Sequence, residues 1–173
     1  GVKSVKMDDI ANLLGISKRT LYEIYSNKEE LLLECIRMHE DLYDKHMAEY
    51  CADASHNVID IIIEFYKHQM QSVNGGSPVF FQELHKYSRV MEFFESRKAR
   101  RNSGAKLFFV RGVSEGFFRK DVDFDFVMQL GSASMEYVMR AELYRQYGME
   151  DILHNILFLF LRGVCTARGI ALL

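Results

Sequence analysis

Residues that interrupt secondary structure are scarce in this sequence. It has a single proline, Pro78, and only 11 glycines among 173 residues. Folds built from short β-strands need many turn residues, and no segment here alternates apolar and polar residues over a sustained stretch. Because long uninterrupted segments favour helices, the sequence predicts an all-α fold.

Cysteine is also rare, and no apolar run is long. Cys35, Cys51 and Cys165 are odd in number and widely spaced, without the C-x-x-C pairs of a structural zinc site. This pattern excludes a disulfide framework and is typical of a protein kept in a reducing cytoplasm. The most apolar stretch, 156–161, stops at Arg162, well short of the about 20 residues that span a bilayer. We therefore expect no membrane partner.

Positive charge is not in excess. The formal net charge is −2, with 22 basic and 24 acidic residues. This balance rules out a uniformly basic nucleic-acid binder, so any surface that binds nucleic acid must be a local one.

Apolar periodicity and capping residues place the helices. Gly15 ends the first, because glycine takes a left-handed C-cap without penalty. Ser17 caps the second, and 26–29 indicates a capping box for the third. In the loop 74–78, Ser77 is the expected cap and Pro78 the first helical residue. The expected helices cover residues 7–14, 18–25, 28–51, 57–73, 79–87, 90–118, 124–147 and 151–168.

Two short helices joined by a glycine-containing turn predict a helix-turn-helix, which places its second helix in the DNA major groove. The small Ala11 lets the two helices cross closely. Apolar residues of the inward side are Ile10, Leu14, Ile16, Leu21 and Tyr25. The outward side of the second helix carries Lys18, Arg19, Tyr22 and Glu23. Between Ser17 and Lys28 the local charge is +2, although an ordinary helix hairpin could contain the same turn.

Residues 1–32 closely resemble the N-terminal segment of the tetracycline-repressor (TetR) family. The matching positions are Asp9-Ile10-Ala11, Gly15-Ile16-Ser17-Lys18, Thr20-Leu21-Tyr22, Tyr25 and Lys28-Glu29-Glu30-Leu31. A looser likeness at 115–123 resembles the turn before the family's dimerisation helices. The resemblance implies a DNA-binding domain over residues 1–50 and an effector-binding and dimerisation domain over 51–173. The family's first helix precedes Gly1 and is absent from this chain.

The resemblance also implies roles for individual residues. Contacts to DNA phosphates are expected from Ser17, Tyr22 and Lys28. Base contacts are expected from Lys18, Arg19 and Thr20, and Glu23 lies at a position that also meets DNA. Lys6 stands where the family usually has threonine, so we expect it to contact phosphate through its charge.

The remaining helices offer material for a ligand pocket and for a dimer interface. A pocket for a small apolar or amphipathic effector would use polar and aromatic residues, although most such residues serve a plain core. The candidates are Tyr66, Gln69, His85, Tyr87, Phe109, Ser134 and Tyr137. The segment 151–168 is apolar on more than one side, which predicts a homodimer formed through the last two helices.

The sequence gives little support for catalysis. We therefore expect that the protein is not an enzyme and that it binds no cofactor or metal. His39, Glu40, Asp44 and His46 follow one helix, and a solvated surface explains them better than a metal site. Ser134 lacks the glycines of a nucleophile elbow. The basic run 97–101 is likewise interpreted as a solvated helix surface.

Two functions follow as hypotheses. The first is a DNA-binding transcriptional regulator, a repressor released from its operator by an effector. The alternative is a helical module that binds a small molecule or lipid without binding DNA.

Overall fold

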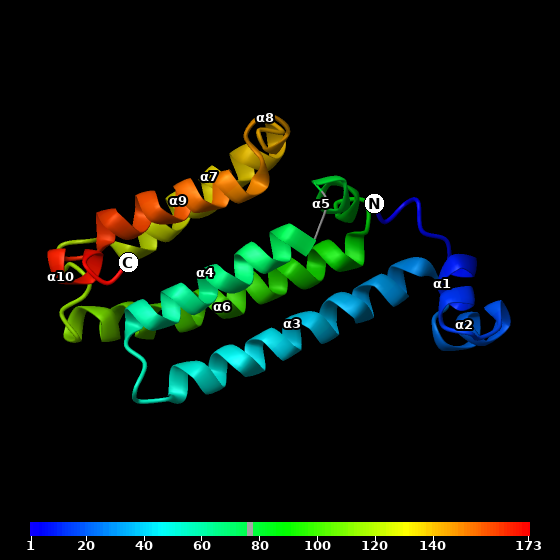
Figure 1. Ribbon diagram of the computed structural model, residues 1–173, viewed down its shortest axis with the longest axis horizontal. Helices are drawn as coiled ribbons and strands as arrows, with labels where there is room; N and C mark the ends of the chain where they lie inside the picture. Colours follow the sequence, from blue (N-terminus) through cyan, green and yellow to red (C-terminus); the bar gives the residue numbers. More distant parts are fainter. Residues whose placement is uncertain (76–77) are drawn as a thin grey trace. The chain divides into compact units, whose positions relative to one another are not determined.

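The computed structural model describes residues 1–75 and 78–173. Its elements, coloured along the chain in Figure 1, are α1 (Met7–Leu13), α2 (Lys18–Ile24), α3 (Lys28–Ala52), α4 (Val58–Gly75), α5 (Pro78–Leu84), α6 (Ser88–Ser114), α7 (Phe124–Arg140), α8 (Tyr144–Tyr147), α9 (Met149–Val164) and α10 (Ala167–Ile170). In the described part, β-pairing is limited to an isolated antiparallel bridge between Phe118 and Cys165. The all-α prediction is confirmed for these residues.

The chain forms two compact units. Unit 1 comprises Gly1–His46 and Val79–Lys98, and unit 2 comprises Met47–Pro78 and Ala99–Leu173. Residues 79–98 thus join the N-terminal unit from the middle of the chain, which no local pattern signals. The predicted domains, 1–50 and 51–173, stay a prediction.

The third helix begins at Lys28, as predicted, but its capping residue is Asn27 rather than Ser26. The side chain of Asn27 accepts a hydrogen bond from the Glu30 amide at 2.9 Å, and the Glu30 carboxylate accepts one from the Ser26 amide at 2.8 Å. Glu29, the predicted partner of Ser26, instead accepts from the Arg89 amide at 3.0 Å. From this start α3 runs for 25 residues, about 37 Å.

The predicted helix over 124–147 is broken in the structure. It ends at Arg140, and Glu142 takes a left-handed φ of 52° before α8 begins at Tyr144. Neither proline nor glycine marks this break. The Tyr144 side chain is buried against Val138 and Ile152, so packing within unit 2 explains the turn.

Three other predicted helices extend at least three residues too far at their C-terminal ends. The helix expected to reach Tyr87 ends at Leu84. The helix expected to reach Phe118 ends at Ser114, and Gly116 follows with a φ of 78°. The helix expected to reach residue 168 ends at Val164, after which Thr166 caps α10. Pro78 is the first residue of α5, as predicted, whereas the predicted cap at Ser77 lies outside the described residues.

The main core of unit 2 is built by α4, the C-terminal part of α6 and α9. Its buried members include Val58, Ile59, Phe118 and Leu161. The ring of Phe118 packs against the backbone of Gly112 on α6, in the space that a Cβ atom would fill. This close approach explains a glycine inside a long helix.

Candidate nucleic-acid interface

Residues 7–25, here called the head, form the predicted helix-turn-helix. Gly15 follows α1 with a left-handed φ of 66°, the conformation that the sequence predicted for it. Ser17 begins α2 by accepting a hydrogen bond from the Thr20 amide at 3.0 Å. These two residues set the turn between the helices and thereby the direction in which α2 projects.

The head has a small core of its own. Met7, Ala11 and Leu21 are buried there, with Ile10, Ile16, Tyr25 and Leu31 packed against them. The predicted membership of Leu14 is wrong, because 60% of this residue is exposed. Its spacing from Met7 and Ala11 would place Leu14 on their side of a longer helix, but α1 ends at Leu13 and Leu14 is its C-cap, where the core does not cover it. The core holds α2 rigidly on α1.

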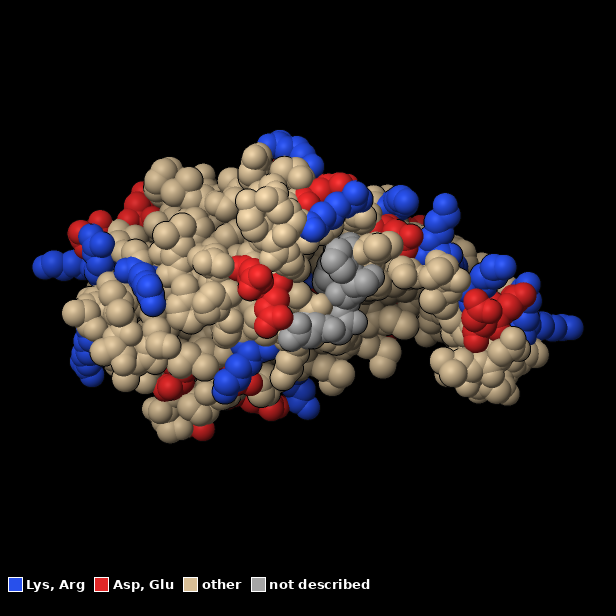
Figure 2. Space-filling model, turned by 45° about the horizontal axis from the view of Figure 1, so that its top comes forward, with Lys and Arg blue, Asp and Glu red and all other residues tan. Residues whose placement is uncertain are grey.

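Basic side chains stand at the start of α2. Lys18 and Arg19 are 58% and 88% exposed, and each pairs with a carboxylate. The Lys18 ammonium lies 2.8 Å from Asp8 of α1, and the Arg19 guanidinium lies 2.9 Å from Glu23. The Asp8 carboxylate raises the pKa of Lys18 above its ordinary value through a hydrogen bond and its negative charge. Figure 2 shows acidic atoms beside basic ones on the head, at the right of the view.

Apart from Lys28, the other predicted DNA contacts lie on α2 or just before α1 and α2. The hydroxyls of Ser17 and Thr20 are 2.8 Å apart and hydrogen-bonded. Tyr22 is partly exposed, with the Lys18 ammonium 6.0 Å from the centre of its ring. Lys6 precedes α1, and its amide donates to Asp9 at 2.8 Å. The structure thus gathers the predicted residues 17–23 on the head and places Lys6 directly before it.

Lys28 lies at the first position of α3 and has partners in the chain. Its ammonium donates hydrogen bonds to the backbone carbonyls of Val2 and Val5. It therefore ties the segment before α1 to the N-terminus of α3. Sequence reasoning gave Lys28 a contact to phosphate and did not foresee this anchoring.

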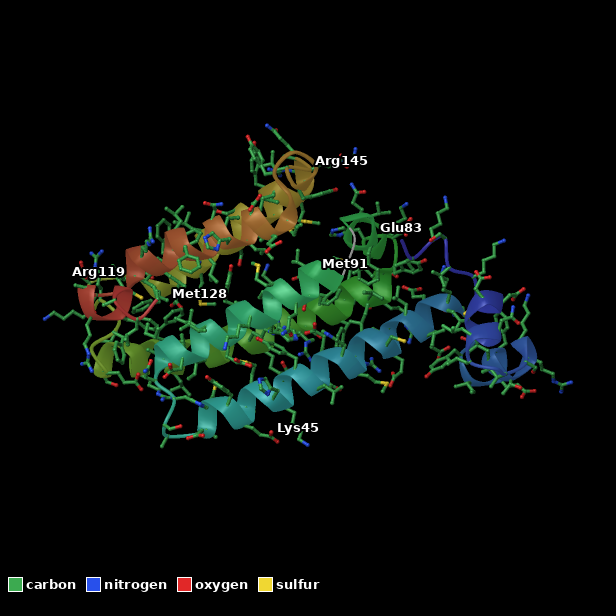
Figure 3. All side chains as sticks on the ribbon, in the orientation of Figure 1. Lys45, Glu83, Met91, Arg119, Met128 and Arg145 are labelled. Carbon is green, nitrogen blue, oxygen red and sulfur yellow. The ribbon has the colours of Figure 1, made fainter. Side chains whose placement is uncertain are left out.

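The segment before α1 is also held by α5. Val2 is buried with Leu33, Leu84 and Val90, and the Glu83 carboxylate accepts a hydrogen bond from the Lys3 amide at 2.7 Å. Glu83 is labelled in Figure 3, on α5 beside the N-terminal segment. Eighty residues separate the two partners, so the sequence carried no signal for this contact.

Lys98, Arg100 and Arg101 are exposed, as predicted for the run 97–101, whereas for Arg97 that interpretation is wrong. Arg97 is buried, and its guanidinium pairs with Glu40 at 3.1 Å, Asp41 at 3.4 Å and Asp44 at 2.6 Å. It also lies 5.5 Å from the centre of the Phe93 ring. The acidic residues of α3 therefore bind a guanidinium from α6 within unit 1.

The predicted ligand-binding residues are divided between the units. His85 and Tyr87 belong to unit 1, and the others belong to unit 2. Phe109 is part of the unit 2 core, stacked on Phe124 with 4.4 Å between ring centres. Ser134 donates to the Leu130 carbonyl, and Tyr137 is exposed on α7. Within unit 2, Phe109 thus lies in the core and Tyr137 at the surface.

Tyr66 is the candidate with the most specific surroundings. Its hydroxyl is hydrogen-bonded to Nδ1 of His154 at 2.9 Å, and the Phe158 ring lies edge-on at 5.7 Å. His154 and Phe158 are four residues apart on α9. Sequence reasoning missed His154, which only the packing of α4 against α9 brings to Tyr66.

The described residues offer neither a cluster of metal ligands nor a membrane-spanning helix. Among the described residues, no three His, Cys, Asp or Glu side chains come together in a way that could hold a metal ion. No described helix has the length and apolar content needed to cross a membrane.

Comparisons with known proteins agree with the geometry of the head. Residues 1–35 match the model of the bacterial regulatory proteins of the tetR family, whose members are DNA-binding regulators rather than enzymes. No curated protein matches the chain significantly. The structure is similar to that of the ketosteroid transcriptional regulator KstR2 of Mycobacterium tuberculosis, with 21% identity, a TM-score of 0.63 and coverage of 96% of this chain and 87% of that one. This second likeness concerns the fold.

Proposed function

Because this chain is a DNA-binding transcriptional regulator of the TetR family, we propose that it represses transcription from an operator and is released by a small effector. The observation that carries the proposal is the head, where two exposed cations start a helix held on its own core. A helix presented in this way fits the major groove, and its first residues reach base edges.

The residues of the head divide into two kinds of contact. Lys18, Arg19 and Thr20 would meet base edges, with Glu23 beside them. Phosphates would be bound by Lys6, Ser17, Tyr22 and Lys28. Arg19→Ala should relax the preference at one base position in each half-site, at a cost of about 1–3 kcal/mol for a bidentate contact.

Titration of the protein on DNA from upstream of its own gene, beside an unrelated duplex of equal length, tests operator binding. We expect the upstream duplex to bind at least about a thousandfold more tightly at physiological salt. Equal affinities for the two duplexes would contradict the proposal. A shift in the preferred base caused by Arg19→Ala would assign that residue to readout.

Assembly as a homodimer through α7 and α9 belongs to the same proposal. Both helices carry large exposed apolar residues, among them Phe126, Leu130, Tyr137 and Leu159. A groove beside them is lined by Val138, Tyr147, Asp151, Ile152, Asn155 and Ile156. A monomer rarely leaves such a surface in water, and a two-fold dimer would match the two half-sites of an operator.

The effector would bind in unit 2, with the Tyr66–His154 pair as its polar contact. Phe158 supplies an aromatic wall next to this pair. An apolar ring compound with one carbonyl or hydroxyl group suits such surroundings. The structural neighbour is named a ketosteroid regulator, so steroid ketones are the first compounds to test. The Tyr66→Phe variant, which keeps the ring, should bind such a compound more weakly.

Release follows from linkage between the two binding events. α3 begins next to the head and ends in unit 2, so one helix joins the parts that would bind DNA and effector. An effector that disfavours the DNA-bound spacing of the two heads weakens operator binding, by about 1–3 kcal/mol in typical systems. Operator affinity measured with and without a compound shown to bind unit 2 tests this. Equal affinities would leave a DNA-binding dimer without the switch.

A further inference from the structure

Each of the exposed cations at the start of α2 has an acidic partner within the head. Both carboxylate oxygens of Asp8 lie close to the Lys18 ammonium, at 2.8 and 3.0 Å. The two residues are ten positions apart and come from different helices of the head. Glu23 holds Arg19 from the next turn of the same helix.

Asp8 changes the charge of the surface that would meet DNA. Counted along the sequence, 17–28 has an excess of two positive charges. In space, the Asp8 carboxylate joins this group and reduces the excess. Binding to DNA of unrelated sequence depends almost wholly on contacts between cations and phosphates. A phosphate that approaches Lys18 must therefore compete with Asp8 and is repelled by it.

A base edge in the operator makes a different demand on Lys18. A lysine ammonium has three N–H donors, so Lys18 can stay paired with Asp8 and still donate to an acceptor on a base. The pair also restricts the four-carbon side chain of Lys18, which otherwise has many rotamers. Asp8 thus disfavours the phosphate-bound arrangement more than the base-bound one.

We infer that Asp8 is a specificity-determining residue for DNA binding, which competes with phosphate for Lys18 and so weakens binding to unrelated sequences. The inference rests on the proposed function, since it needs an operator to which the protein binds preferentially. Removing the charge of Asp8 should tighten binding to unrelated DNA and lower the ratio between the two affinities.

The test is a double-mutant cycle on the full chain. The wild type, Asp8→Asn, Lys18→Met and the double variant are titrated on the upstream duplex and on an unrelated duplex, between 50 and 200 mM salt. For Asp8→Asn we expect about three- to tenfold tighter binding to the unrelated duplex, and a salt slope steeper by about one phosphate contact. Operator affinity should change less than about twofold, because a single exposed ion pair contributes little free energy.

Two controls make the result specific. Glu49→Gln removes one negative charge from an exposed position on α3 and should leave both affinities and slopes unchanged. Asp8→Asn in the Lys18→Met background should tighten binding to the unrelated duplex much less than it does in the wild-type background. A gain in affinity cannot arise from unfolding of the head.

The outcomes separate this inference from the function on which it rests. If Asp8→Asn binds unrelated DNA as the wild type does, or gains as much affinity without Lys18 as with it, the inferred role of Asp8 is wrong. The proposed function still stands in that case if the wild type binds the upstream duplex more tightly than the unrelated one. If the wild type binds both duplexes equally, operator recognition and the role of Asp8 fail together.

Discussion

The Nη2 atom of Arg97 lies 2.6 Å from the Asp44 carboxylate, although Arg97 is only 5% exposed. Glu40 and Asp41 complete the contacts of the guanidinium. A buried guanidinium stabilises a fold only while its partners remain. This cluster therefore joins α3 to α6 within unit 1.

Replacing Arg97 should destabilise the protein more than replacing its most exposed partner. Arg97→Met removes all three ion pairs, but the carboxylates left behind are partly hydrated. We expect a loss of about 1–3 kcal/mol in the free energy of unfolding. Asp41 is 70% exposed, so Asp41→Asn should cost less than about 0.5 kcal/mol. Urea titrations of the two variants measure both values. If the two variants lose equal free energy of unfolding, Arg97 does not hold the cluster together.

The glycines of α6 provide a matched pair for unit 2. An added Cβ atom at Gly112 would meet the ring of Phe118, whereas nothing lies within 4 Å of one at Gly104. Gly112→Ala should destabilise the protein by about 1–3 kcal/mol through overpacking. Gly104→Ala should stabilise it by about 0.5–1 kcal/mol, because alanine is the better helix former. Thermal unfolding that moves in the same direction for both variants would refute this difference.

The dimer proposal is tested best at Leu159, which is 72% exposed. Leu157, two residues earlier on α9, is less suitable because it packs against the core of unit 2. Leu159→Glu would bury an unpaired carboxylate in the proposed interface and should give monomers in light scattering. Leu107 on α6 is 76% exposed, and Leu107→Glu should leave the dimer intact. The reverse result would move the interface away from α9.

Local features of the head could be predicted from the sequence, whereas contacts between distant segments could not. Gly15 and Ser17 act through their own backbone and the next few residues, so their roles were predicted correctly. Arg97 was misassigned because its acidic partners lie more than 50 residues away. The break at Glu142 was missed because the burial of Tyr144, rather than a turn residue, causes it.

Charge counting along the sequence was incomplete for the same reason. The local excess of positive charge is real, but Asp8 lies outside the counted window and reaches Lys18 through space. Leu14 was assigned to the core because its spacing from Ala11 fits the buried side of α1, but spacing does not tell that the helix ends one residue earlier, at Leu13. The ligand candidates were selected by residue type, and type does not decide whether a side chain such as Phe109 belongs to a core.

Lys28 should affect DNA binding through phosphate. If Lys28 makes one phosphate contact, Lys28→Ala should make the slope of the logarithm of the binding constant against the logarithm of the salt concentration shallower by about one unit. Binding to all sequences should weaken about equally. Lys45 lies on the same helix about 25 Å further along, is labelled in Figure 3 and is exposed. Lys45→Ala should leave the slope unchanged. If the Lys28→Ala variant has the wild-type salt slope, Lys28 does not contact phosphate and its role is limited to the hydrogen bonds with Val2 and Val5.

Glu83 should position the head without touching DNA. Glu83→Ala removes the acceptor of the Lys3 amide, and a lost hydrogen bond of about 1 kcal/mol corresponds to a several-fold faster exchange of that amide hydrogen. Since Val2 and Lys3 belong to the short segment that leads into α1, we expect operator affinity to fall about three- to tenfold with an unchanged salt slope. Glu83→Gln keeps a carbonyl oxygen at the same place and should restore most of the affinity. Unchanged exchange at Lys3 in Glu83→Ala, or a flatter salt slope, would show that α5 does not hold the head in this way.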